Sequence, residues 1–386
     1  MPSKTSVLKR HKLAAIIVVV VIVLAMLAAI LLIGPVRSWS VDRQIAEIEA
    51  ERAVPDSENA AVLYRQFFED FGVPERSVSN IVTPQADTDT ARKPWRSSDH
   101  PELAALIEEN REAIARLVEI TKMEQCCFPI PCTEEQLYSP ITPTSEMRPW
   151  LFFLSRAINN DIGEGRIEAA IQKYACIVRM VGHLYQQPVI MHQLVGIAIE
   201  AYPTTMAARL IVEGDMSNTR LDLMAEVLLG VEDRWQREKE TILSIDAVRE
   251  AKWQQQLSFI ERVREWLEFG RGADYAESME CQYYHVLGVR RGLHILVALR
   301  RFRNGRGHWP DSLEAIAPML ADKILSDTEI CGTFIYKTAG DDFVLYGTGP
   351  NGIDDGGKGR PDDDDVPVWP TSRMLFEEKR KKQNAK

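Results

Sequence analysis

The spacing of apolar and polar residues predicts helices along most of the chain, beginning with an unbroken apolar run at residues 13–33. These 21 residues carry no charge. At about 1.5 Å per helical residue they extend roughly 31 Å, which matches the hydrocarbon core of a bilayer. Only a helix satisfies the backbone of a single segment in lipid. We therefore expect residues 13–33 to form a transmembrane helix.

The flanks of this run predict its orientation. Residues 1–12 contain Lys4, Lys9, Arg10, His11 and Lys12, and such a basic flank stays in the cytoplasm. A cleavable signal, the alternative, has an apolar core of roughly 7 to 15 residues followed closely by a small-residue cleavage site. We expect an uncleaved anchor, with residues 1–12 as a cytoplasmic flank and the rest of the chain outside the cytoplasm.

Residues 40–303 form an expected extracytoplasmic helical domain. Apolar positions repeat with helical spacing, which predicts helices at 41–52, 58–71, 101–123, 150–160, 166–186, 189–212, 220–269 and 280–302. Asp56 or Ser57 is the expected cap of the second helix, and the helix from 220 is expected to break near Ile245. Residues 72–98 and 126–149 read as loops. Short connections between long helices favour an irregular antiparallel helical array.

The pattern changes after residue 303, where a small α+β unit is expected at 304–370. A short helix is predicted at 313–320, and strands at 333–337 and 342–346 are joined by a turn suited to a hairpin. Residues 347–369 are rich in glycine and aspartate and read as a loop. Residues 371–386 form an expected basic tail. The predicted fold class is thus mainly α, with a small C-terminal α+β unit.

The net charge of −10 argues against nucleic acid, or an anionic membrane surface, as a partner. Outside the cytoplasm some of the six cysteines are expected to be oxidised. Cys126, Cys127 and Cys132 lie in a proline-rich loop that we expect disulfides to hold, and a metal site is the alternative. Cys176 lies in an apolar helical pattern, which predicts a core residue.

The acidic loop carries the most specific candidate chemistry. Residues 347–365 place six carboxylates among glycines and prolines, so this segment cannot bury apolar area. A hard cation would relieve the repulsion between the carboxylates, and calcium accepts six to eight oxygens in loose geometry. The alternative is a solvated acidic loop. The spacing does not match an EF-hand.

The end of the chain resembles the C-terminal half of the major pseudopilin of type II secretion. The resemblance rests on five segments: 309–314 (WPDSLE), 334–336 (FIY), 342–347 (DFVLYG), 351–359 (NGIDDGGKG) and 365–366 (DV). It implies a calcium site whose ligands are Asp354 or Asp355 and Asp364 or Asp365, with carbonyls near Tyr346 and Gly349 assisting.

The chain departs from the pseudopilin pattern in several places. Asn351 stands where the family usually has Asp, and one extra residue precedes Gly356. The apolar run lacks the family's glutamate near its start, so a filament subunit is not expected. The whole layout is similar to membrane-anchored bacterial proteins without an assigned activity. That likeness implies a single pass through the bacterial inner membrane.

No catalytic motif of the common hydrolase, metalloprotease, P-loop or dinucleotide-binding kinds occurs in the sequence. His183, His192, His285 and His294 are expected to be packed or surface histidines. Our first hypothesis is a non-enzymatic scaffold or interaction protein of the envelope, with protein partners and a calcium-stabilised loop; the pseudopilin resemblance implies a relation to secretion. The alternative is a membrane-anchored, metal-dependent envelope hydrolase that uses the acidic loop.

Overall fold

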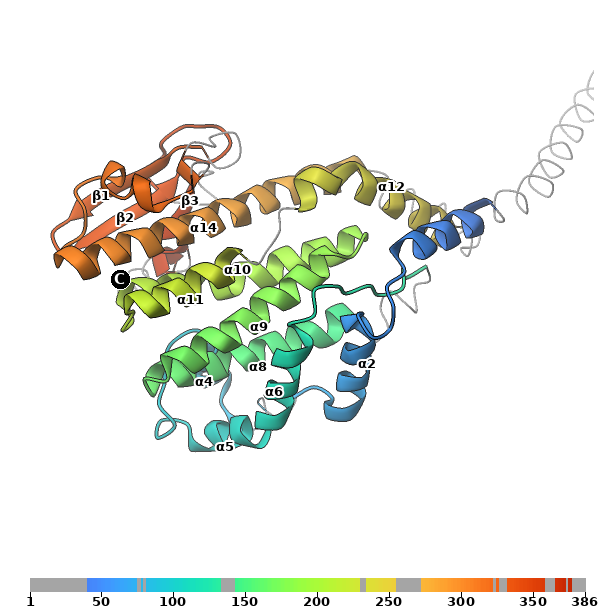
Figure 1. Cartoon of the computed structure of the whole chain (residues 1–386), viewed down its shortest axis with the longest axis horizontal. Coiled ribbons are helices and arrows are strands. Elements are labelled where there is room, and N and C mark those ends of the chain that lie inside the picture. Colours follow the sequence, from blue (N-terminus) through green and yellow to red (C-terminus); the bar gives the residue numbers. More distant parts are fainter. Residues whose placement is uncertain are drawn as a thin grey trace, which may run out of the picture.

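The structure is a computed structural model, and it describes residues 40–74, 78, 81–132, 143–229, 234–254, 272–321, 324–325, 332–357, 365–372 and 374–376. Within these ranges the chain is mainly helical, with a small antiparallel sheet near its C-terminal end, as the sequence predicts (Figure 1). The expected membrane helix at 13–33 and its basic flank lie outside the described residues, as does most of the tail.

The first described helices differ from the prediction in how they begin. Residues 40–52 are helical, and α2 spans Ala60–Phe71. Its cap is Asn59, whose side chain accepts a hydrogen bond from Ala61 N at 3.0 Å. The prediction of Asp56 or Ser57 is wrong because these residues lie in a turn closed by Glu58 N donating to Pro55 O at 2.8 Å.

Two further corrections concern residues 72–123. Part of the expected loop is helix α4, Pro84–Thr90, which begins where Thr83 accepts a hydrogen bond from Ala86 N and Pro84 occupies the first turn. The expected helix 101–123 is divided into α5, Pro101–Glu109, and α6, Arg111–Ile120. The division falls at Asn110, whose side chain donates to Leu106 O at 2.9 Å and competes with the helical pattern.

The body is built from six longer helices. They are α8 (Pro143–Gly163), α9 (Ile167–Tyr185), α10 (Ile190–Glu213), α11 (Asn218–Leu229), α12 (Arg234–Gln254) and α14 (Gly272–Arg306). Helix α9 lies between α8 and α10, and α10 and α11 pack against α14 (Figure 1). The prediction of a break near Ile245 is wrong because α12 continues through that residue.

Helix α10 is the described helix that is long and apolar enough to cross a membrane, but 67% of its most apolar window is buried inside the protein. Its neighbours α9 and α14 cover it, and it contains a buried glutamate, Glu200. These features are those of a core helix. Trp150 and Phe153 of α8 are fully buried in the same cluster.

The C-terminal sheet has three strands, β1 (Phe334–Ala339), β2 (Asp342–Gly347) and β3 (Val366–Trp369), in the order β1-β2-β3. Both pairings are antiparallel. The hairpin β1-β2 is confirmed. Two 3-10 turns, Leu313–Ala315 and Ala317–Met319, replace the single helix expected at 313–320.

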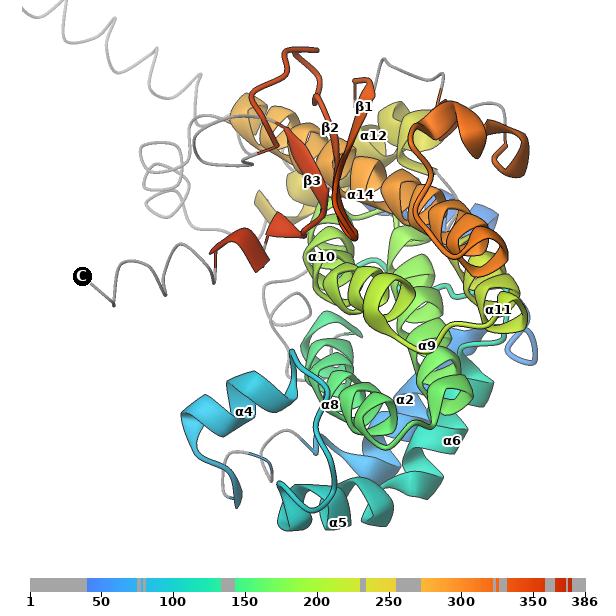
Figure 2. The ribbon, with the colours of Figure 1, turned by 90° about the vertical axis from the view of Figure 1, so that its left-hand side faces the viewer.

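Strand β3 was not predicted, because its residues fall in the stretch that reads as loop. All four of its residues are buried, and the strand lies beside α14 (Figure 2). The approach is closest at Gly292 of α14, where a Cβ atom would collide with the side chain of Val368. The sheet is therefore fitted to the helical body at a position where one helix lacks a side chain.

Candidate functional site

The structure describes three of the four predicted calcium ligands, Asp354, Asp355 and Asp365, while Asp364 lies outside the described residues. Asp354 Oδ1 accepts hydrogen bonds from Tyr346 OH at 2.8 Å and from Gly356 N at 3.0 Å. Lys337 Nζ lies 3.5 Å from Asp354 Oδ2. The hydrogen bond from Tyr346, followed by that from Gly356 N, lowers the pKa of Asp354.

Asp365 closes the other end of the loop. Its side chain is fully buried, and Oδ2 accepts a hydrogen bond from Gly357 N at 2.6 Å. Asp354 and Asp365 thus fix the loop to itself, and the Lys337 ammonium competes with any cation at Asp354. The described residues contain no group of three side chains placed to hold a metal. They do not by themselves form a calcium cage, and calcium binding stays a prediction.

The cysteine loop is held by amide side chains. Asn59 exchanges two hydrogen bonds with the backbone of Cys127, at 2.9 and 3.0 Å, and Gln187 Nε2 donates to Cys126 O at 2.7 Å. Cys126 and Cys127 carry free thiols, so the expected disulfide at these two residues is wrong. Burial raises the pKa of both thiols, which keeps them protonated and weak as metal ligands or nucleophiles.

A buried ion pair joins three helices in the core. Arg290 of α14 donates from Nε and Nη2 to the two carboxylate oxygens of Glu200 on α10, each at 2.7 Å. Tyr185 OH of α9 donates to Glu200 Oε2 at 2.8 Å. Because the charges are paired and hydrogen-bonded, the group is suited to holding the helices in register.

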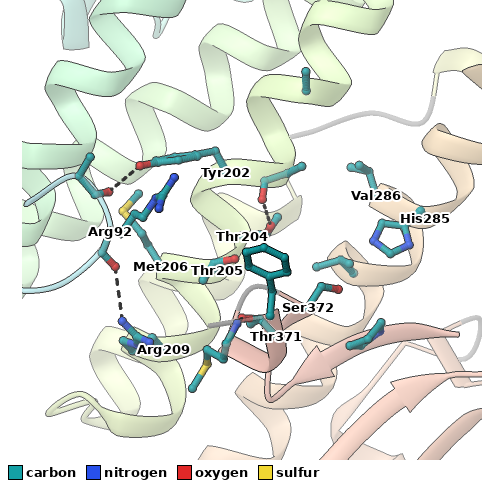
Figure 3. A pocket seen from close by; sticks show the side chains of 17 residues that line it. Arg92, Tyr202, Thr204, Thr205, Met206, Arg209, His285, Val286, Thr371 and Ser372 are labelled. Atoms are coloured by element: carbon teal, nitrogen blue, oxygen red, sulfur yellow. Dashed lines mark hydrogen bonds between the residues drawn. The ribbon is translucent and has the colours of Figure 1, made fainter. Parts of the chain in front are cut away.

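A cavity of about 390 Å³ lies where the helical body meets the segment after β3. Residues of α10 and α14 form two walls, and residues 91–92 after α4 form a third (Figure 3). The lining is completed by Pro367, Thr371, Ser372, Met374 and Phe376. Volumes of 300 to 1,000 Å³ are usual for small-molecule sites. Unlike the acidic loop, this cavity brings together residues that lie nearly 300 positions apart in the sequence.

Hydrogen bonds fix the wall formed by residues 91–92. Tyr202 OH donates to Ala91 O at 3.1 Å, and Arg209 Nη1 donates to Arg92 O at 3.4 Å (Figure 3). Both donors lie on α10, within two turns of each other. The cavity is thus shaped by an ordered connection between two distant parts of the chain.

The lining combines cations with apolar groups. Arg92 and Arg209 stand on one side, and His285 and Val286 stand on the other (Figure 3). No carboxylate of the described chain lines the cavity. Arg209 Nε lies 3.4 Å from Glu213, a half-exposed carboxylate. The Nε atoms of Arg92 and Arg209 are both buried without a hydrogen-bond partner among the residues described.

Sequence reasoning missed the lining residues and the buried ion pair. Glu200 gave a signal, because a lone carboxylate in the middle of an apolar helix requires a partner. Arg92 gave none, since nothing in its surroundings along the sequence indicates that it meets α10. Of the predicted histidines, His183 and His192 are buried as expected, and His285 lines the cavity.

The fold and the cavity define a mainly helical protein with a small C-terminal sheet and a cationic, partly apolar pocket at their junction. Comparison of the chain with known protein families, curated proteins and solved structures finds no match. The likeness to the major pseudopilin and to membrane-anchored bacterial proteins therefore stays a prediction from the sequence.

Proposed function

We propose that the chain is a non-catalytic binding protein of the bacterial cell envelope. In this proposal residues 13–33 anchor it in the inner membrane, and an antiparallel helical array with its C-terminal unit projects outside the cytoplasm. The basic flank and the apolar run support the anchor. The binding role rests on the cavity between α10 and α14, one wall of which, residues 91–92, is fixed by hydrogen bonds.

The composition of the cavity supports binding. Its side chains supply a cation, hydroxyl groups and apolar surface, which orient and hold a ligand. Asp354 and Asp365 of the acidic loop, which the hydrolase hypothesis needs in its metal site, are bonded to their own loop, and no described carboxylate of the loop lines this cavity. No observation therefore favours the hydrolase over the binding protein.

Protein partners in the envelope and calcium at the acidic loop complete the proposal. A scaffold of this kind would hold a ligand in the cavity and present its helical surface to other envelope proteins. Calcium would neutralise carboxylates of the acidic loop, residues 347–365. The support for calcium is the density of aspartate and glycine in the loop.

The test is whether the cavity retains a small molecule from the cell. The full chain would be purified in mild detergent and extracted with solvent, and the extract identified by mass spectrometry. Ala201 lines the cavity and is exposed, so Ala201→Trp fills the space. We expect a molecule that the parent retains and Ala201→Trp loses. Ala105→Trp, on an exposed position of α5, is the matched control.

Identical extracts from the parent, Ala201→Trp and Ala105→Trp would contradict the proposed binding role. Folding of each variant is checked by its melting temperature, so that a loss of ligand is not confused with a loss of structure.

A further inference from the structure

We infer that the cavity between α10 and α14 binds a small carboxylate with an apolar body, whose head group pairs with Arg92. The inference rests on the proposed binding function and names the ligand class for the same site. Three observations support it: the cavity lining is cationic, the Nε of Arg92 has no hydrogen bond among the described residues, and several other lining side chains are apolar.

The charge of the lining is opposite to that of the molecule. The chain carries a net charge of −10, yet the cavity is lined by two arginines and a histidine and by no carboxylate of the described residues. Acidic residues outnumber basic residues in this chain, so its composition does not predict a positively charged cavity. The fold brings these cationic side chains together. Such a site concentrates anions at its entrance and repels cations.

Arg92 is a cation prepared for an anionic partner. Its Nε is buried without a hydrogen bond among the described residues, and the described carboxylate that acts on its charge, Asp89, does so without a hydrogen bond to that atom. Burying a guanidinium N–H without a hydrogen bond is costly, and a ligand carboxylate would remove that cost through paired N–H···O hydrogen bonds. The backbone carbonyl of Arg92 is held by Arg209, so the position of this residue is fixed before a ligand arrives.

The remaining surface suits an apolar body. Val286 and Val289 of α14 and Met374 and Phe376 of the C-terminal segment line the cavity. Phe376 is 61% exposed, so its ring is accessible to a ligand. A ligand that buries this ring gains hydrophobic stabilisation. Head group and body together define a small amphipathic anion.

The test uses octanoate as the probe. The full chain in lipid nanodiscs would be dialysed to equilibrium against carboxyl-labelled octanoate, with empty nanodiscs as the blank for partition into lipid. Octanamide keeps the shape of the molecule and removes the charge, and acetate keeps the charge and removes the chain. We expect saturable binding of one octanoate per chain, with much weaker binding of octanamide and acetate.

Arg92→Gln is expected to lower the affinity for octanoate roughly 10- to 100-fold, the usual range for losing a charge-assisted hydrogen bond. Arg65→Gln, at an exposed position of α2 outside the cavity, is expected to leave the affinity unchanged. Ala201→Trp is expected to abolish binding of every probe, because it removes the space.

Three outcomes would overturn the inference. Equal affinities for octanoate and octanamide, both lost in Ala201→Trp, would show that the cavity binds apolar molecules without regard to charge, and the proposed binding function would stand. Preference for octanoate that survives Arg92→Gln would remove Arg92 from the site. No saturable binding of octanoate would exclude this ligand class, and the extraction experiment would then judge the binding function independently.

Discussion

The buried pair of Glu200 and Arg290 is a strong determinant of stability at the scale of single residues. Arg290→Met leaves the Glu200 carboxylate buried without its cation, so we expect a loss of about 3 to 5 kcal/mol in the free energy of unfolding. Adding Glu200→Gln removes the stranded charge and keeps an acceptor for Tyr185, and we expect it to restore at least half of the loss. Urea unfolding measures both changes.

Arg43→Met provides the control for this prediction. Arg43 pairs with Glu47 on the surface at 64% and 56% side-chain exposure, and exposed pairs of this kind contribute about 1 kcal/mol or less. A loss in Arg290→Met no larger than that in Arg43→Met would show that the buried pair does not stabilise the core.

His192 makes the core sensitive to acid. Burial, aided by the charges of Arg52 and Arg249, lowers its pKa from 6.5 to about 4. Below pH 6.5 the unfolded chain therefore binds a proton that the folded chain does not, and stability falls as the pH drops towards 4. In His192→Leu we expect the loss of unfolding free energy between pH 7 and pH 5 to be smaller by about 2 kcal/mol.

Urea unfolding at both pH values measures this difference. His192 Nδ1 has no hydrogen bond among the described residues, so leucine breaks none at that atom. Met191→Leu, at the exposed neighbouring position, is the control and should show the acid sensitivity of the parent. An equal loss of unfolding free energy between pH 7 and pH 5 in His192→Leu and in the parent would show that His192 does not cause the sensitivity to acid.

At the scale of elements, the contact between α14 and β3 fixes the sheet on the body. Helix propensity alone predicts that Gly292→Ala stabilises by about 1 kcal/mol. Because the new methyl group would collide with Val368, we expect instead a loss of about 1 to 3 kcal/mol. Gly182→Ala in α9, where no atom lies near the added group, should show the gain from propensity. A similar gain in both variants would contradict the tight packing.

The acidic loop is the second element with a direct test. If it binds calcium, a chelator lowers the melting temperature of the full chain, and Asp354→Asn combined with Asp365→Asn removes that response while keeping acceptors for Gly356 N and Gly357 N. Asp56→Asn, at an exposed turn, should keep the response of the parent. An unchanged melting temperature of the parent in chelator would exclude the calcium prediction.

Sequence patterns predicted the long core helices and the hairpin. The core helices α9 and α10 and the hairpin β1-β2 are found within one or two residues of their expected ends. The patterns failed at two kinds of place. Thr83 and Pro84 start a short helix in an expected loop through a local cap, and β3 forms because α14 and β2 offer it a buried place. The contacts of β3 are made by distant residues and leave no local period.

At the scale of the whole molecule, the two candidate sites differ in how far the sequence predicts them: the acidic loop is a contiguous segment, and the cavity is formed by distant residues. The acidic loop is contiguous, so the sequence alone identified Asp354 and Asp365, but it did not indicate that they bond to Gly356 N and Gly357 N. The cavity depends on the approach of Arg92 to α10, which no local pattern specifies. Its charge, and hence the ligand class that we infer, emerges only from the folded chain.

The orientation of the chain in the membrane tests the central claim most directly, because the envelope function requires the helical body to lie outside the cytoplasm. The measurement is the activity of alkaline phosphatase, which works only outside the cytoplasm, and the fluorescence of a protein that matures only inside it, each fused after Lys386 in separate bacterial strains. We predict an active phosphatase and no fluorescence, both dependent on residues 13–33. A fluorescent fusion with an inactive phosphatase would contradict the proposed function.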